Sequence, residues 1–268
     1  MPHTCLFTVT TGRSGTAYLT DLLRVNFPEA EVHHEILGYD AFGVDTPDLS
    51  DRVQFNAFGN TVKVQGFWQQ KLARIADKPV PLYAETSHLL AKAGLIENLG
   101  SLAATAQVQI VLLRRDLLKT ISSFQSRYDF LNKGNMWMWY LDPDYPRNIV
   151  SPTPLMSWGW SGICTWYVCE MLTRMEYYRL LFADAAGIRF IDANIDQLNE
   201  PAQVAGFLSQ LGFSRSPDEI VIPSPQNTGT EESSRPPMPV EFRKFVEKMV
   251  FDPKGLADEY IRSGRRLG

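Results

Sequence analysis

The chain contains little cysteine and little histidine: three cysteines and four histidines occur among its 268 residues. Cys5, Cys164 and Cys169 form no closely spaced cysteine pair of the kind that binds zinc. An odd and sparse set of thiols excludes a scaffold built on disulfides and indicates a reducing compartment. Because no cluster of histidines compensates for the missing cysteine pairs, the sequence also predicts no structural metal site.

A large excess of either charge is absent as well, since the formal net charge is −4. This balance argues against a protein that binds nucleic acid mainly through phosphate contacts, but it leaves room for a local basic pocket. No stretch approaches the roughly 18 consecutive apolar residues of a membrane span, and an apolar segment begins too close to Met1 to leave room for a signal peptide. We therefore expect a cytoplasmic protein without a membrane span.

A glycine-bounded turn near the N-terminus is the first informative feature. An apolar run rich in β-branched residues leads into Gly-Arg-Ser-Gly-Thr, and the apolar residues that follow recur at helical spacing, which predicts strand, tight turn and helix. The N–H groups of such a turn and the positive end of the helix suit a phosphate. Gly12 and Gly15 permit close approach of the backbone. Ser14 and Thr16 add hydroxyl donors, and Arg13 adds a fixed positive charge.

This turn differs from the phosphate loop of ATPases. That loop has four residues between its glycines and then Gly-Lys-Ser/Thr, whereas here two residues separate the glycines and Thr-Ala follows. An ordinary strand-to-helix turn without a ligand is the alternative interpretation. The hypothesis of an anion site therefore needs a second, independent element.

The second element follows an apolar run at 108–113, which is typical of a buried parallel strand. The run ends in two arginines, and a helix is predicted to begin directly after them. An arginine at the strand end and a serine two turns into the helix can converge on a second anion, either as Arg115 with Ser123 or, one residue earlier, as Arg114 with Ser122. The alternative is an arginine paired with a nearby acid and a serine bonded to its own helix.

Polar side chains also end two other predicted strands. His34 and Glu35 close a short strand predicted over 29–37, and Glu85 lies in a strand predicted over 82–88. Because the carboxyl ends of parallel strands share one rim, the first pair is expected beside the glycine turn. Strand alternation points neighbours to opposite faces, so only one of His34 and Glu35 should face the site. For each of the three, a solvated or salt-bridged rim residue is the alternative.

The elements together predict a single α/β domain over 1–268 with a mostly parallel sheet. We interpret 38–60 as a long connection and 61–67 as a further strand. The aromatic-rich segment at about 125–160 is predicted to be an insertion or lid, which either lines an acceptor pocket or packs as its own core. A flexible loop is predicted at about 214–239. The other predicted elements are a strand at 187–192 and helices at 69–77, 89–102, 164–182, 201–211, 240–250 and 256–261.

These features resemble the sulfotransferases that use 3′-phosphoadenosine 5′-phosphosulfate (PAPS). The turn that contains Arg13 resembles their 5′-phosphosulfate loop, and the segment from Arg115 to Ser123 resembles their 3′-phosphate motif, an arginine after a buried strand with a serine eight residues on. The strand at 189–192 and its following helix are similar to the last strand and helix of that family. The resemblance covers most of the chain except the aromatic segment. Leu117 departs from it, because a proline is common at that position.

The resemblance implies a P-loop NTPase-like, three-layer α/β/α fold and transfer of a sulfuryl group to a hydroxyl of a small-molecule or carbohydrate acceptor, with PAPS as cosubstrate and without a metal. Arg13 would stabilise the bridging oxygen of the leaving nucleotide. Glu35 lies where several bacterial sulfotransferases place a catalytic glutamate, His34 is adjacent, and Glu85 resembles a glutamate of carbohydrate sulfotransferases, so any of the three is a candidate base. The implied cofactor-binding residues are Gly12, Arg13, Ser14, Gly15, Thr16, Ala17, Arg115 and Ser123.

Two other functions fit the same elements. One is a P-loop kinase of metabolites, against which the missing Gly-Lys-Ser/Thr counts. The other is a non-catalytic module that binds a nucleotide. Neither the acceptor nor the oligomeric state is specified by the sequence, and no nucleic-acid partner is expected.

Overall fold

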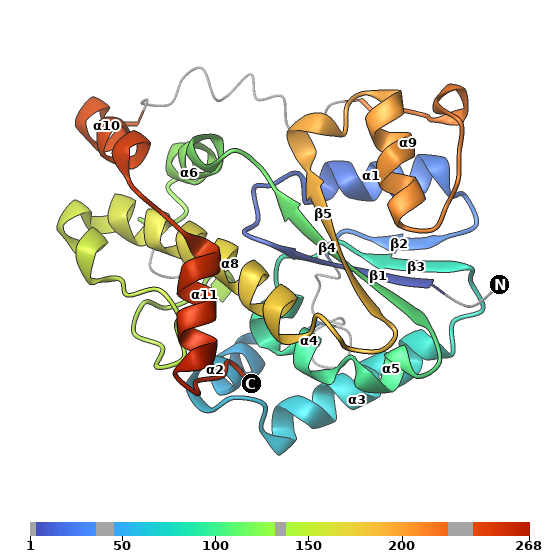
Figure 1. Cartoon of the computed structure of the whole chain (residues 1–268), viewed down its shortest axis with the longest axis horizontal. Helices are drawn as coiled ribbons and strands as arrows, with labels where there is room; N and C mark the ends of the chain where they lie inside the picture. The colour runs from blue at the N-terminus through green and yellow to red at the C-terminus, as the bar shows by residue number, and fades with distance from the viewer. Residues whose placement is uncertain (1–3, 36–45, 132–137, 225–237) are drawn as a thin grey trace.

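The computed structural model describes residues 4–35, 46–131, 138–224 and 238–268. Its centre is a sheet of five strands, all parallel, in the order β2-β3-β1-β4-β5 (Figure 1). The strands are β1 Thr4–Thr10, β2 Glu31–His33, β3 Leu82–Glu85, β4 Gln107–Arg114 and β5 Ile188–Asn194. The α/β class and the parallel sheet predicted from the sequence are thus confirmed.

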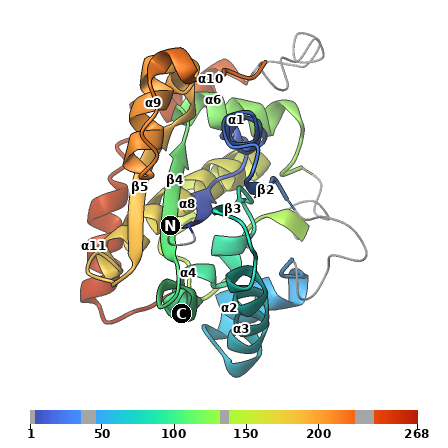
Figure 2. The same ribbon diagram turned by 90° about the vertical axis from the view of Figure 1, so that its right-hand side faces the viewer.

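Helices cover both faces of the sheet, which is consistent with three layers. α1 (Thr16–Asn26) and α9 (Pro201–Gln210) pack on one face, and α3 (Val62–Ala76), α8 (Gly159–Leu181) and α11 (Pro253–Arg262) belong to the cluster on the other (Figures 1 and 2). Other helices with bounds inside the described ranges are α2 Leu49–Phe58, α4 Leu95–Asn98, α5 Gly100–Ala103, α6 Leu117–Ser126 and α10 Val240–Lys248, with 3₁₀ turns η1 Leu90–Ala93, η2 Thr153–Trp158, η3 Ile195–Gln197 and η4 Pro217–Glu219. No helix within the described ranges combines the length and apolarity needed to cross a membrane.

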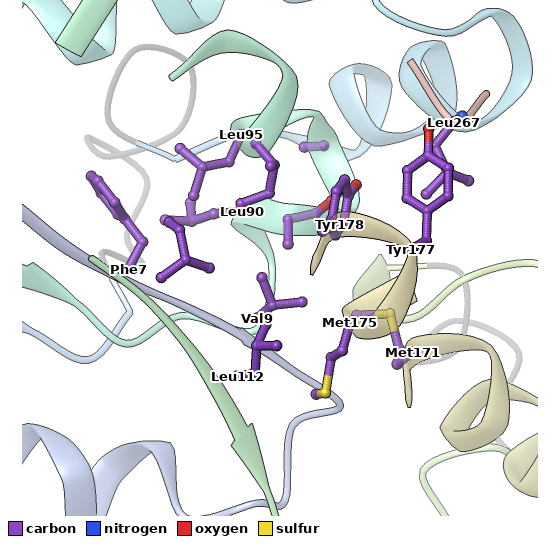
Figure 3. Packing of buried hydrophobic residues seen from close by; sticks show 14 of the residues in the cluster. Phe7, Val9, Leu90, Leu95, Leu112, Met171, Met175, Tyr177, Tyr178 and Leu267 are labelled. Carbon is purple, nitrogen blue, oxygen red and sulfur yellow. Dashed lines mark hydrogen bonds between the residues drawn. The ribbon is translucent and has the colours of Figure 1, made fainter. Parts of the chain in front are cut away.

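Strand β1 explains how both layers attach to the sheet. All of its residues are buried, and its side chains alternate between the faces: Leu6 packs with the cluster of α1 and α9, while Phe7 and Val9 pack with the cluster of α8. Figure 3 shows Val9 and Leu112 of the sheet beside Met175 of α8, while Phe7 lies toward Leu90 and Leu95. A strand buried on both faces accounts for the continuous apolar run seen in the sequence.

The order of the strands also marks a position for ligands. From β1 the chain passes through α1 to β2 on one side of the sheet, whereas β4 joins β1 on the other side. The carboxyl end of β1 is therefore a topological switch point, where open parallel sheets form a crevice that binds ligands. The glycine turn lies directly at that end.

Two sequence-based assignments were wrong. The strand predicted over 61–67 lies in helix α3, whose buried residues Val64, Trp68 and Leu72 recur at helical spacing. The described part of the predicted connection over 38–60 contains α2, which begins with a reciprocal capping box between Asp48 and Asp51. Both errors arose because short windows emphasised β-branched and turn-forming residues, whereas burial of one helical face decides the structure over longer windows.

Candidate functional site

The glycine turn has a fixed and unusual backbone. Gly12, Arg13 and Gly15 all adopt left-handed conformations, with φ of 77°, 56° and 83°. The buried Ser14 hydroxyl donates to the carbonyl of Gly12 at 3.1 Å, and it lies 2.7 Å from the hydroxyl of Thr11. A non-glycine residue with positive φ is uncommon and is maintained only when its surroundings enforce it. The positive φ of Arg13 therefore distinguishes this turn from an ordinary strand-to-helix turn, and the surrounding turn fixes the backbone from which the Arg13 side chain extends.

Helix α1 begins at this turn without a capping side chain. Its N-cap is Gly15, no described side chain accepts a hydrogen bond from its first N–H groups, and its first turn contains no acidic residue. These N–H groups and the helix dipole are the physical components of an anion site. A Cβ at position 15 would lie 2.4 Å from the Ile195 side chain, so glycine is required there for space as well as for backbone conformation.

The helix start borders a cavity of ≈ 650 Å³, which we call the Arg115 cavity. The two elements that the sequence predicted separately meet here: Arg13 Nε donates to the hydroxyl of Ser123 at 3.2 Å, and Arg115 Nη1 donates to the carbonyl of Arg13 at 3.4 Å. The cavity is lined by Arg13, Gly15, Thr16, Ala17, Tyr18, His34, Arg115, Lys119, Ser123, Ile195, Asp196, Asn199, Ile222 and Pro223.

The structure also separates the two possible registers of the arginine–serine pair. Arg115 and Ser123 line the Arg115 cavity. Arg114 instead forms ion pairs with Glu176 and with Asp192, and neither it nor the exposed Ser122 lines that cavity. Only the register with Arg115 brings a cation and a hydroxyl to the glycine turn.

The cations of the Arg115 cavity are partly neutralised. Asp196 Oδ1 lies 3.8 Å from Arg115 Nε, and its Oδ2 lies 3.1 Å from Lys119 Nζ. Lys119 and Asp196 were not predicted from the sequence as site residues. Lys119 follows Arg115 by four residues and lies in the first turn of α6, which is a usable signal, whereas Asp196, in η3, reaches the cavity only because of the position of β5.

A second cavity of ≈ 360 Å³, here called the Glu35 cavity, adjoins the first. Arg13, Thr16 and His34 line both cavities. The two cavities therefore share a boundary at the glycine turn, an arrangement with room for two ligands side by side. Its lining comprises Gly12, Arg13, Thr16, His34, Glu35, His88, Phe124, Arg127, Asp129, Trp139 and Tyr140.

His34 and Glu35 both line the Glu35 cavity, contrary to the expectation that only one would face the site. Strand alternation does not apply to them, because β2 ends at His33. His34 Nε2 lies 3.4 Å from the Thr16 hydroxyl, and Glu35 Oε1 lies 3.4 Å from Nε2 of His88. Burial raises the pKa of Glu35, with the charges of His34 and Lys92 acting in the opposite direction. A carboxylate with a raised pKa is better matched to proton abstraction near neutral pH.

Glu85 has a different environment. It is 1% exposed and lines neither cavity. Its carboxylate lies 3.0 Å from Lys71 Nζ and accepts a hydrogen bond from the Tyr83 hydroxyl at 3.2 Å. A buried carboxylate with these partners fits a structural ion pair, which was the alternative considered for this residue.

The aromatic segment contributes to the Glu35 cavity in part. Trp139 and Tyr140 line it, together with Phe124 of α6, whereas Trp158 packs against Phe242 of α10. The segment therefore supplies both cavity lining and core. Residues 132–137 and 225–237, within the predicted lid and loop, lie outside the described residues.

His88 lines the Glu35 cavity although the sequence did not predict it as a site residue. It follows β3 and stacks on Tyr140 with ring centroids 6.0 Å apart.

Within the described ranges, no group of three His, Cys, Asp or Glu side chains is placed to hold a metal ion. A scan against protein-family models and a search of curated proteins found no match to this chain.

Proposed function

We propose that this protein is a sulfotransferase that moves a sulfuryl group from PAPS to a hydroxyl of a small-molecule or carbohydrate acceptor, on a P-loop-like fold. The observation that carries the proposal is the contact of Arg13 with Ser123 and of Arg115 with the Arg13 carbonyl around one cavity. A nucleotide with a single phosphate chain needs one anion site. A nucleotide with separate 5′ and 3′ phosphates needs two, and the turn and the Arg115–Ser123 pair supply them.

Each cavity takes one ligand in this proposal. In the Arg115 cavity, the N–H groups at the start of α1 hold the 5′-phosphosulfate and Arg115 with Ser123 holds the 3′-phosphate. The acceptor occupies the Glu35 cavity. The acceptor O–H bond breaks and its proton passes to Glu35, a bond forms between the acceptor oxygen and sulfur, and the bond from sulfur to the bridging oxygen breaks. Arg13 stabilises the charge that develops on that oxygen.

Calorimetry without metal tests the cofactor. We expect the protein to prefer 3′-phosphoadenosine 5′-phosphate (PAP) over ADP and ATP. Arg115→Ala should weaken PAP binding roughly 10- to 100-fold, because a charge-assisted contact contributes about 1.5–3 kcal/mol. Arg114→Ala is the matched control and should keep the preference. Equal or tighter binding of ATP would contradict the proposal and favour a kinase.

Turnover tests the base. With PAPS and a panel of hydroxyl acceptors, Glu35→Gln should lower kcat by about 10²- to 10⁴-fold while PAP binding is retained. His34→Gln reports on the neighbouring candidate in the same assay. Full activity of the Glu35 variant would remove that residue from the mechanism.

A further inference from the structure

Lys92 is an unusual charged residue behind the Glu35 cavity. It is 0% exposed, and no ion pair found among the described residues includes it. Its Nζ lies 2.8 Å from Nδ1 of His88 and 3.1 Å from the hydroxyl of Tyr167, and it donates to the carbonyl of Trp139. Burying an amine without an acid is costly, so this arrangement calls for a function.

The contacts of Lys92 match those of an ammonium group. An ammonium has three N–H donors and no acceptor. The carbonyl of Trp139 can only accept. The Tyr167 hydroxyl donates its own proton to the carbonyl of Thr11 at 2.7 Å, so its oxygen is free to accept. The third donor is directed at Nδ1 of His88.

This contact determines where His88 carries its proton. A ring nitrogen that accepts from Lys92 has no hydrogen, so the neutral imidazole is protonated on Nε2. Nε2 is the atom that lies 3.4 Å from Glu35 Oε1. The proton is therefore directed at the carboxylate, whereas the opposite tautomer would direct a lone pair at it.

We propose that Lys92 is a positioning residue: by donating to His88 Nδ1 it keeps the imidazole proton on Nε2, and so holds Glu35 ionised and oriented as the base. The inference rests on the proposed function for the role of Glu35. During transfer only Glu35 gains a proton, from the acceptor hydroxyl. Lys92 and His88 keep theirs throughout, and neither touches the transferred group.

The electrostatics give the sign of the effect. Burial lowers the pKa values of Lys92 and His88 and raises the pKa of Glu35, while the Lys92 charge lowers the pKa of Glu35. Removing that charge and the donor on Nδ1 should therefore raise the pKa of Glu35. The other charged or titratable groups that act on these three side chains are Arg13, His34, Arg52, Glu85 and Arg174.

The test compares the parent with Lys92→Met, which keeps an unbranched chain but removes the charge and the donors. Nitrogen-15 NMR of the imidazole, identified by its loss in His88→Gln, reports the tautomer without cofactor or acceptor. We expect a proton on Nε2 in the parent and its redistribution to Nδ1 in Lys92→Met. Tyr167→Phe is the matched control, because it removes another contact of Lys92 but should keep the parental tautomer.

The pH dependence gives the second readout. In Lys92→Met the rising limb of the pH profile of kcat/KM should move to higher pH by about one unit. At a pH on the acid side of that limb, kcat/KM should therefore fall about tenfold, while KM for PAPS is unchanged. The inference is overturned if the imidazole of His88 carries its proton on Nδ1 in the parent. It is also overturned if Lys92→Met keeps both the tautomer and the pH profile of the parent. If the variant does not fold, the parental spectrum decides alone. Absence of sulfuryl transfer in the parent would refute the proposed function, while the NMR result would still decide the role of Lys92 in setting the tautomer.

Discussion

Asp196 should weaken the binding of the nucleotide that the Arg115 cavity is proposed to hold. Its carboxylate lies 3.8 Å from Arg115 and 3.1 Å from Lys119, where a phosphate would also bind. The Asp196 and Arg115 side chains are 32% and 34% exposed, so the dielectric of water applies. At roughly 6 Å this gives about 0.7 kcal/mol per pair of unit charges, or about 1–1.4 kcal/mol for a phosphate. We predict that Asp196→Asn binds PAP about 5- to 10-fold more tightly.

Calorimetric titration with PAP measures this gain. Asp192→Asn is the control, because it makes the same change of charge at a residue that pairs with Arg114 and Arg179 and lines neither cavity. The gain in Asp196→Asn should shrink as salt is added, and it should be absent for AMP, which has no 3′-phosphate. Weaker PAP binding in Asp196→Asn would refute the reasoning, since it would show that the carboxylate is needed to hold the two cations in place.

Three further changes test other parts of the structure. Burial raises the pKa of Glu97 from 4.5 to about 7, so the folded state favours the neutral acid and loses stability as pH rises from 4.5 through 7. Glu97→Gln should add about 3 kcal/mol to the unfolding free energy at pH 8 and little at pH 4, as measured by denaturant titration. Glu85→Gln breaks a buried ion pair and should cost about 3–5 kcal/mol of stability. Because the Glu85 charge, in addition to burial, raises the pKa of Glu35, the rising limb of the pH–rate profile should move to lower pH while kcat on the plateau is kept; a loss of kcat of about 10²-fold or more would restore Glu85 as a candidate base. Gly15→Ala should weaken PAP binding more than tenfold in calorimetry, because the added Cβ would lie 2.4 Å from the Ile195 side chain. Gly212→Ala is the control and should leave PAP binding unchanged, because Gly212 has a similar φ of +89° but no atom of the described residues lies within 4 Å of an added Cβ.

The sequence predicted the central part of the fold because local patterns determine it. Strands β1 and β4 are apolar runs buried in the middle of the sheet, and glycines follow β1 where the backbone becomes left-handed. Such runs leave little choice of structure. The segment that forms α3 was misassigned because its first residues, Val62 and Val64, are β-branched, whereas its helical burial becomes visible only over the whole helix.

The site was less predictable because long-range contacts decide it. Arg114 and Arg115 follow the same strand, and only the positions of α8 and β5 give Arg114 its acidic partners. Lys92 contacts residues 47 and 75 positions away in the sequence, and no periodicity in the chain indicates such contacts. Glu85 lies at the end of β3 and Glu35 lies just beyond the end of β2. Glu85 is buried in an ion pair with Lys71 and lines neither cavity, whereas Glu35 lines one of them.

The boundary between the two cavities is the most informative feature for mechanism. In-line transfer needs the leaving oxygen on one side of the moving group and the acceptor hydroxyl on the other. Of the residues that line both cavities, Arg13 is the one with a permanent charge, and its left-handed backbone and its bond to Ser123 fix its direction. Arg115 lines only one cavity and Glu35 only the other. Under the proposed function, a cation at this boundary would stabilise the transferring group and not only bind a ligand.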